Sequence, residues 1–431
     1  MHVYNLVSFA GIFIFIGIAW LLSSDKKRMN WHVVGWGIGL QLIVAFFIFI
    51  VPAGAKLFLF VNDIVVKVLE SANEGARFVF GPLAIPPGAE GSMGFFLAFQ
   101  GLPTIIFFSA LMAILYYFRI MPFLIRWFGS VFSRLMKLSG AESLCASSNI
   151  FVGVESSLTI KPHLNEMTRS ELCTVLTAGM ATVASNVLAL YVFMLQGRFP
   201  TIAGHLISAS FLSAPAALIM SKIILPETKT PKTLGVAIHP HYEKESNVFE
   251  AIIRGANSAV KMIVGIVALL IAFLGLVALV DLIIGGIGTP VNEYLAINID
   301  WSLKGLLGYV FYIPALICGI PPADAGEIAK IIGERLVVTE VTAYKDLASL
   351  IAEDALVYPR SAVITTYALC GFAHVASMAI FVGGVSALAP SKTRVLSRIA
   401  FRALIAATLA CLMTACIAGA FYTEGSILLG N

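Results

Sequence analysis

The sequence predicts an all-α polytopic membrane protein with about eight transmembrane helices and two re-entrant hairpins in an inverted repeat. Its composition, its apolar runs and its loop charges each support this fold class. Of its 431 residues, 59% are hydrophobic and 12% are charged, whereas soluble domains carry about 25% charged residues. The mean hydropathy is +0.93. Many apolar runs reach the roughly 20 residues that cross a hydrocarbon core, and they lack the short alternation of barrel strands.

The apolar runs define the expected spans. They lie at residues 5–22, 31–51, 97–118, 171–195, 201–221, 257–285, 361–386 and 400–421. Residues 56–80 carry charges among apolar positions, which predicts an amphipathic interfacial helix. The first run lacks a basic leader and a small-residue cleavage site, so we expect a span there rather than a signal peptide.

Two further stretches, 141–167 and 322–353, are too polar for plain spans and too apolar for loops. Both contain helix-breaking Gly or Pro residues, which indicates re-entrant helical hairpins. Irregular backbone at membrane depth is tolerated only when it is buried in protein or lines a cavity. An amphipathic lead-in precedes each hairpin, and a span rich in Gly and Ala follows it, which we interpret as a broken helix. Hairpin 1 is expected to enter from the cytoplasm and hairpin 2 from outside.

Loop charges set the orientation, because cytoplasmic loops carry the excess of Lys and Arg. One set of alternate connectors is rich in these residues, whereas the opposite set holds only Lys56, Lys67, Arg77 and Arg198. We therefore expect the basic set to be cytoplasmic and both termini to lie outside. The basic connectors hold Lys26, Lys27, Arg28, Arg119, Arg126, Arg134, Lys137, Lys222, Lys229, Lys232, Lys244, Arg254, Lys392, Arg394, Arg398 and Arg402. The net charge of +4 is spread over short loops, so no nucleic-acid partner is expected.

These features divide the chain into four parts. Residues 1–137 are expected to form scaffold helices with the interfacial helix, and 138–225 the first transport repeat. Residues 226–300 are expected to form a connector and a scaffold helix, and 301–431 the second transport repeat.

Two glutamates, Glu155 and Glu340, lie within the hairpin segments, one in each half of the chain. A carboxylate near the bilayer centre costs roughly 2.5–3.5 kcal/mol, so it is expected to face a polar cavity, a partner charge or a substrate. The spans after the hairpins add His374 and Ser377, with Thr182 open to interpretation as a simple packing residue. Other mid-membrane polar residues are Ser185, Asn186 and Asn149, and Asn149 suits either a Na⁺ ligand or a cap.

No catalytic motif emerges, since GxSxG, P-loop, HExxH and CxxC patterns are all absent from the sequence. We therefore expect a transporter rather than an enzyme, with no organic cofactor. The six cysteines fall in apolar stretches without metal-ligand spacing, which favours core residues.

Six segments resemble the concentrative nucleoside transporter family in its shorter bacterial form. The resemblance runs from about residue 100 to 421. The segments are NIFVGVESSLTIKPHL (149–164), GMATVASNVLALY (179–191), VTEVTAYKDL (338–347), ALCGFAHVASMAIFVGGV (368–385), ALAP (387–390) and RALIAATLACLMTACIAG (402–419).

The resemblance implies a homotrimer in which an outer transport domain moves against a central scaffold. It also implies a nucleoside site between the two hairpin tips and the two broken helices. The base would face Val154, Glu155 and Val187, and the ribose would face Glu340, Phe372, His374 and Ser377. Na⁺ would be held by Asn149, Thr182 and the carbonyls of Val152 and Val183.

This chain departs from the family pattern around the substrate. The usual first tip reads G-Q-T-E, but here Gly153, Val154 and Glu155 follow one another, so one residue and two polar partners are missing. His374 stands where the family usually has Asn, and Thr339 also replaces an Asn. Such changes are expected to alter the choice of substrate rather than the fold.

The leading hypothesis is therefore cation-coupled uptake of a nucleoside-like molecule by alternating access, in a lipid-embedded protein of the bacterial inner membrane. Na⁺ is the favoured coupling ion. His374 leaves H⁺ as an alternative, because imidazole changes its charge near neutral pH. A H⁺-coupled transporter of another small polar solute, a receptor that binds without transport and a passive channel are the rival hypotheses.

Overall fold

A computed structural model describes residues 3–86, 89–236, 238–242 and 245–423, and within these ranges the chain forms helices and no strand. Among the described residues, seven helical segments are long and apolar enough to cross a membrane. They are Val3–Leu21, Trp31–Phe49, Leu97–Tyr117, Arg169–Leu195, Ile202–Ile224, Val248–Leu295 and Pro390–Phe421. The predicted polytopic helical fold is thereby confirmed. The eighth predicted span, 361–386, is divided between two shorter helices.

The N-terminal part consists of helices that precede the first hairpin. They are α1 (Val3–Leu21), α2 (Trp31–Phe49), α3 (Pro52–Phe80) and α4 (Leu102–Tyr117), with 3₁₀ helices η1 (Lys26–Arg28) and η2 (Gly81–Ala84) and the π-helix η3 (Leu97–Gly101) between them. The predicted interfacial helix is α3, in which Pro52 takes the first helical position, where its missing N–H costs nothing.

The first repeat begins with the lead-in helix α5 and ends with a long helix. Its elements are α5 (Ile120–Met136), the hairpin arms α6 (Gly140–Ser148) and η4 (Val154–Glu166), the half-helices α7 (Arg169–Ala181) and α8 (Ser185–Leu195), and α9 (Ile202–Ile224). The second arm of the predicted helical hairpin, η4, is a 3₁₀ helix. Pro162 lies inside it and cannot donate an α-helical hydrogen bond, and the Thr159 hydroxyl bonds the Ser156 carbonyl at 2.6 Å.

The second repeat has the same order of elements, as the inverted repeat predicts. They are α11 (Leu303–Ile317), the hairpin arms α12 (Pro322–Val337) and α13 (Glu340–Ala352), the half-helices α14 (Pro359–Leu369) and α15 (Val375–Leu388), η5 (Pro390–Lys392) and α16 (Thr393–Phe421). α11 packs along α12, and α16 packs against α1, α7, α9 and α14.

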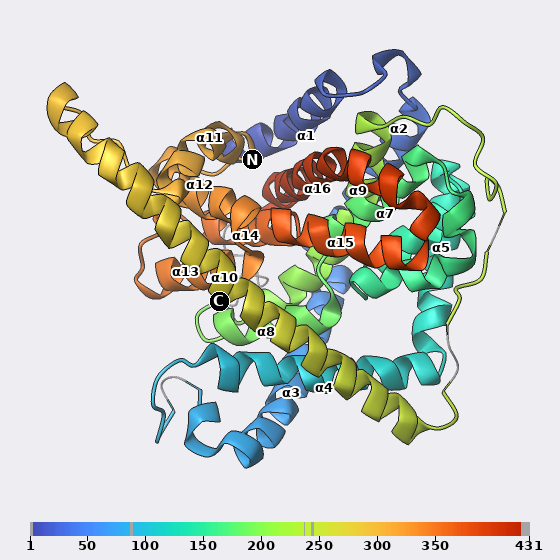
Figure 1. Ribbon diagram of the computed structural model, residues 1–431, viewed down its shortest axis with the longest axis horizontal. Helices are drawn as coiled ribbons and strands as arrows, with labels where there is room; N and C mark the ends of the chain where they lie inside the picture. Colours follow the sequence, from blue (N-terminus) through green and yellow to red (C-terminus); the bar gives the residue numbers. More distant parts are fainter. Residues whose placement is uncertain (1–2, 87–88, 237, 243–244, 424–431) are drawn as a thin grey trace.

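The long helix α10 (Val248–Leu295) joins the two repeats and lies at the outside of the molecule. Figure 1 shows it crossing the front of the molecule diagonally, with one end projecting beyond the other helices. It packs against α4, yet only 6% of its most apolar window is buried, compared with 89% for α9. The apolar face of α10 is therefore left for lipid or for another subunit.

Serine and threonine caps fix where the repeat 1 helices begin. Ser139 and Glu142 form a capping box at the start of α6, and Thr168 and Glu171 form another at the start of α7. Both acidic residues lie near the buried Lys222, whose Nζ is 2.6 Å from Glu142. This cluster ties the base of hairpin 1 to α9.

Candidate functional site

The two broken helices cross each other at their breaks. The first break lies between Ala181 and Ser185, and the second between Leu369 and Val375. Gly371, at φ +152°, lies where they meet, because a Cβ there would come within 2.8 Å of the Ala181 carbonyl oxygen. Only glycine permits this approach. The unwound backbone of both repeats is thus gathered in one place.

Glu340 is the first residue of α13 and lies at the tip of hairpin 2, where its side chain is 6% exposed. Its Oε1 accepts a hydrogen bond of 2.6 Å from the Tyr191 hydroxyl. Its Oε2 forms an ion-pair contact of 2.8 Å with His374 Nε2. Each carboxylate oxygen has two lone pairs, so the group can still accept from a ligand, and the N-terminus of α13 favours its negative charge.

His374 caps the second half-helix of repeat 2. Its Nδ1 accepts from the backbone N–H of Ser377 at 3.2 Å, which makes it the N-cap of α15. A ring nitrogen that accepts carries no proton, so the ring's hydrogen lies on Nε2. That atom lies 2.7 Å from the Ser377 hydroxyl and 2.8 Å from Glu340 Oε2, so its hydrogen is within reach of both oxygens.

The other predicted ribose residues lie in the same region. Ser377 is buried one turn into α15, and Phe372 is half-buried in the break that precedes His374. The structure thus brings together three of the four predicted ribose-side residues through contacts, with Phe372 two residues away along the chain.

Sequence reasoning missed Tyr191. It is fully buried on α8, and its ring stacks on Tyr344 with ring centroids 4.4 Å apart and planes at 26°. The only signal in the sequence is a tyrosine that closes a motif otherwise made of small and apolar residues. A buried phenol hydroxyl requires a partner, and here Glu340 provides it.

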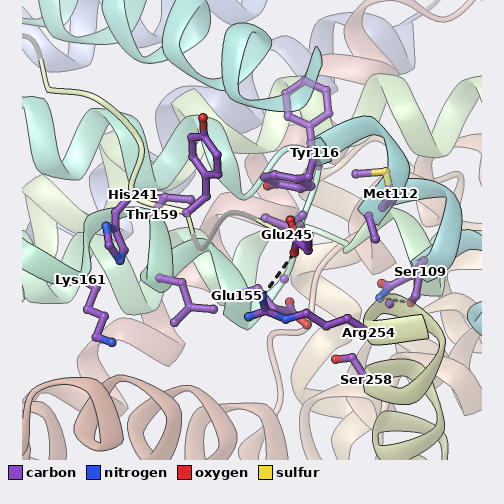
Figure 2. Close-up of a pocket in the computed structure, with 18 residues that line it drawn as sticks. Ser109, Met112, Tyr116, Glu155, Thr159, Lys161, His241, Glu245, Arg254 and Ser258 are labelled. Atoms are coloured by element: carbon purple, nitrogen blue, oxygen red, sulfur yellow. Dashed lines mark hydrogen bonds and ion pairs between the residues drawn. The ribbon is translucent and has the colours of Figure 1, made fainter. Parts of the chain in front are cut away.

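Glu155 has a different environment from Glu340. Its side chain is exposed and lines a cavity of about 330 Å³ together with Tyr116 and Asn186. Figure 2 shows the cavity, in which Arg254 Nη1 lies 3.3 Å from Glu245. Helices α4, α8 and α10, the hairpin 1 tip and the connector before α10 all contribute to the wall. Glu155 therefore lies at the wall of a cavity rather than in the packed core.

The remaining predicted base-side residues are less informative. Val187 is buried on α8, next to the cavity residue Asn186. The side chain of Val154 lies outside the described part of the structure. The lining of the cavity does not include Glu340, His374 or Ser377. The two predicted ends of the nucleoside site are therefore built from separate groups of side chains.

The four predicted cation ligands lie around the hairpin 1 tip and the first break. Asn149 is fully buried, and its Oδ1 has no hydrogen-bond partner in the described residues, while its Nδ2 donates to the Cys145 carbonyl. The Ser185 N–H bonds the Phe151 carbonyl at 3.2 Å, which joins the Val152 segment to the Val183 segment. Thr182 is buried, and its hydroxyl donates to the Ala178 carbonyl at 2.9 Å.

These oxygens fit a small hard cation. The orphaned Asn149 Oδ1 needs a donor or a positive charge, and unwound carbonyls are the groups that hold Na⁺ in broken-helix transporters. Across the described ranges, no group of three or more His, Cys, Asp or Glu side chains forms a metal site. All six cysteines are buried and free, as the sequence analysis expects of core residues.

Comparison with known proteins identifies the family. The nucleoside permease NupC of Helicobacter pylori is 35% identical over 425 residues, covering 97% of this chain and 98% of that protein. This chain belongs to the Na⁺-dependent nucleoside transporter family. The family models for the N-terminus and C-terminus of the Na⁺-dependent nucleoside transporter match residues 10–83 and 205–419, and a nucleoside recognition (Gate) model matches 98–198. The resemblance drawn from the sequence is confirmed, and the relatives are transporters rather than enzymes.

A solved structure of this transporter family has the same fold. CNTnw in an inward-facing substrate-bound state matches with a TM-score of 0.86 and 34% identity, covering 97% of this chain and 98% of that chain. Solute carrier family 28 member 3 of Mus musculus is 38% identical over 96% of this chain. This chain spans only 58% of that mammalian relative.

Proposed function

We propose that this protein takes up nucleosides by secondary active transport coupled to Na⁺. The proposal depends chiefly on Glu340, a buried carboxylate whose Oε1 accepts from Tyr191 and whose Oε2 lies 2.8 Å from His374 Nε2. A carboxylate has about four lone-pair sites, so these two contacts leave it able to accept further hydrogen bonds. A ribose hydroxyl can donate to Oε2, and Ser377 and His374 lie beside it to bind a neighbouring hydroxyl.

The base is expected to occupy the cavity that Glu155 lines. The Gln and Thr of the usual tip are not present beside this cavity, so the tip offers a base fewer polar partners. Tyr116 and Phe151 offer aromatic faces, and Glu155 offers an acceptor to exocyclic amines. We infer a broad preference among bases, which Val154→Gln should narrow.

Na⁺ is the coupling ion that the geometry favours. Asn149 Oδ1 is buried and has no hydrogen-bond partner among the residues that the structure describes, which leaves it available to a cation. H⁺ coupling through His374 is disfavoured, because a proton on Nδ1 would break the cap to Ser377. Na⁺ would bind the uncharged oxygens of Asn149, Thr182, Val152 and Val183. It would thereby join hairpin 1 to the break in repeat 1.

Translocation would move residues 138–225 and 301–431 against residues 1–137 and 226–300. The exposed apolar face of α10, including Ile271 and Leu282, supports assembly of three copies around the scaffold. The arrangement of basic connectors supports placement in a bacterial inner membrane with both termini outside. Chemical cross-linking in native membranes would test the trimer.

Proteoliposomes containing the purified full chain test the proposal. Radiolabelled uridine and adenosine should accumulate under an inward Na⁺ gradient, and Glu340→Gln should abolish most accumulation. Glu353→Gln, an exposed carboxylate in the connector after α13, is the matched control and should transport normally. Accumulation driven only by a proton gradient would identify H⁺ as the ion instead. Nucleoside binding without accumulation would favour a receptor. The proposal would be refuted if the protein neither bound nor accumulated nucleosides.

A further inference from the structure

Tyr191 connects the two repeats at the site. It belongs to α8 of repeat 1, whereas Glu340, which accepts its hydrogen bond, and Tyr344, on which its ring stacks, belong to α13 of hairpin 2. Glu340 and Tyr344 are four residues apart, so they lie on the same face of that helix. One residue of repeat 1 thus holds one face of the second hairpin arm through a hydrogen bond and a stacked ring.

The hydrogen bond also decides which carboxylate oxygen is left for a ligand. Glu340 Oε1 is occupied by the Tyr191 hydroxyl at 2.6 Å, so the carboxylate cannot rotate without losing that bond. Oε2 is then the oxygen that faces His374, 2.8 Å from its Nε2, and its remaining lone pair is left for a ligand. Tyr191 itself cannot turn away, because it is fully buried and stacked on Tyr344.

The tip of hairpin 2 has few other polar contacts. Val338 and Thr339 separate α12 from α13, and the buried Thr339 hydroxyl has no hydrogen-bond partner in the described chain. Tyr344 is anchored independently, since its hydroxyl donates to the Thr366 carbonyl at 3.0 Å. Displacing the tip from α8 therefore breaks the Tyr191–Glu340 bond, and that bond is a charge-assisted one.

We propose that Tyr191 is a positioning residue: it holds the tip of hairpin 2 against α8 and presents Glu340 Oε2 to the substrate. We call the first of these roles, holding the tip against α8, the latch. The latch follows from contacts within the protein alone. The role of Tyr191 in substrate affinity rests on the function proposed above.

Tyr191→Phe tests both roles, because phenylalanine keeps the stacked ring and removes only the hydroxyl. Tyr344→Phe is the matched control, since it removes another buried phenol hydroxyl from the same pair of stacked rings without touching Glu340. Hydrogen bonds to charged groups contribute enough to change affinity by about ten- to a hundredfold. We expect Tyr191→Phe to raise the KM for uridine by at least about tenfold with Vmax within about twofold. Tyr344→Phe should leave KM within about twofold of the wild type.

A second measurement reports on the latch without any transport. Val338 is 1% exposed at the hairpin 2 tip. Val338→Cys is introduced into the wild type and into each tyrosine variant, and the purified protein in nanodiscs is labelled with a soluble maleimide without substrate. Protein without the added cysteine corrects for its six buried cysteines. Labelling should be several-fold faster in the Tyr191→Phe background than in the Tyr344→Phe background.

Equal labelling rates and equal KM values in the two tyrosine variants would overturn the inference. Faster labelling in the Tyr191→Phe background, in a protein that transports no nucleoside, would support the latch and refute only the proposed function. A lower Vmax with unchanged KM and unchanged labelling would show a general packing defect and would also overturn the inference.

Discussion

The Nδ1 atom of His374 accepts a hydrogen bond from the backbone N–H of Ser377, at 3.2 Å, and so caps the helix that carries both residues. The relationship explains why the chain tolerates histidine where its family usually has asparagine, because asparagine is also a strong N-cap residue. It also places the ring's hydrogen on Nε2, 2.8 Å from the Glu340 carboxylate.

The cap predicts a difference between two substitutions of His374. His374→Ala should lower the stability of the purified protein by about 1 kcal/mol, whereas His374→Asn should retain it, because the Asn side chain replaces the lost acceptor. Thermal unfolding in detergent measures the difference. Equal losses in both variants would mean that the cap contributes nothing. Na⁺-driven uptake by His374→Asn should keep the pH profile of the wild type, and a profile that flattens would indicate that the ring carries the coupled proton.

Substitution of Asn149 is expected to change the sodium dependence of uptake. Asn149→Ala removes the buried Oδ1 that has no partner among the described residues, so the Na⁺ concentration for half-maximal uptake should rise about tenfold or more. The KM for nucleoside at saturating Na⁺ should change much less. Asn165→Ala is the control, since that asparagine is exposed and its Oδ1 accepts a hydrogen bond from the Ser391 hydroxyl. An unchanged sodium curve for Asn149→Ala would remove this residue from the cation site.

The sequence was informative wherever a residue type contrasts with its surroundings. Glu340 and His374 stand out as charged or titratable groups in apolar runs, and both lie at the centre of the site. Tyr191 does not stand out, because a tyrosine in an apolar helix has the pattern of a core residue. Its partner Glu340 is 149 residues away, and only the tertiary fold brings them together.

The local conformation of the hairpins was harder to predict than their existence. Gly and Pro indicated where the chain reverses, but periodicity did not distinguish the 3₁₀ arm Val154–Glu166 from an α-helix. The cavity beside Glu155 likewise depends on Arg254 and Glu245, which the sequence analysis assigned to a connector. Ion pairs between elements depend on packing rather than on spacing.

Replacing Gly371 with alanine is expected to cause a severe local packing defect. An added Cβ would lie 2.7 Å from Cys411 Sγ and 2.8 Å from the Ala181 carbonyl oxygen, at a positive φ. Gly371→Ala should therefore destabilise the protein by about 1–3 kcal/mol. Gly383→Ala on α15 is the control, because nothing lies within 4 Å of its added Cβ, and it should be neutral or slightly stabilising. The same melting temperature for both variants would contradict the crossing of the two breaks.

We expect Lys304 to make a salt-sensitive contribution to the stability of hairpin 2. Its Nζ lies 2.9 Å from Glu334 on α12 and also pairs with Asp346 on α13, so it joins the two arms. Lys304→Met should lower Tm by about 2–4 °C in low salt, because two carboxylates then face each other without a cation. Lys330→Met breaks only a pair within α12 and is the control. The difference between the variants should shrink at high ionic strength, and a difference that persists would point to packing rather than charge.

The central claim is that sodium and a nucleoside bind this protein together, the first at Asn149 and the second at Glu340. Isothermal titration of uridine into the purified protein, in Na⁺ and in choline, tests it most directly. The account predicts that Na⁺ tightens the Kd for uridine by about tenfold and that uridine tightens Na⁺ binding by the same factor, because coupling is reciprocal. Equal uridine affinity in Na⁺ and choline would contradict it.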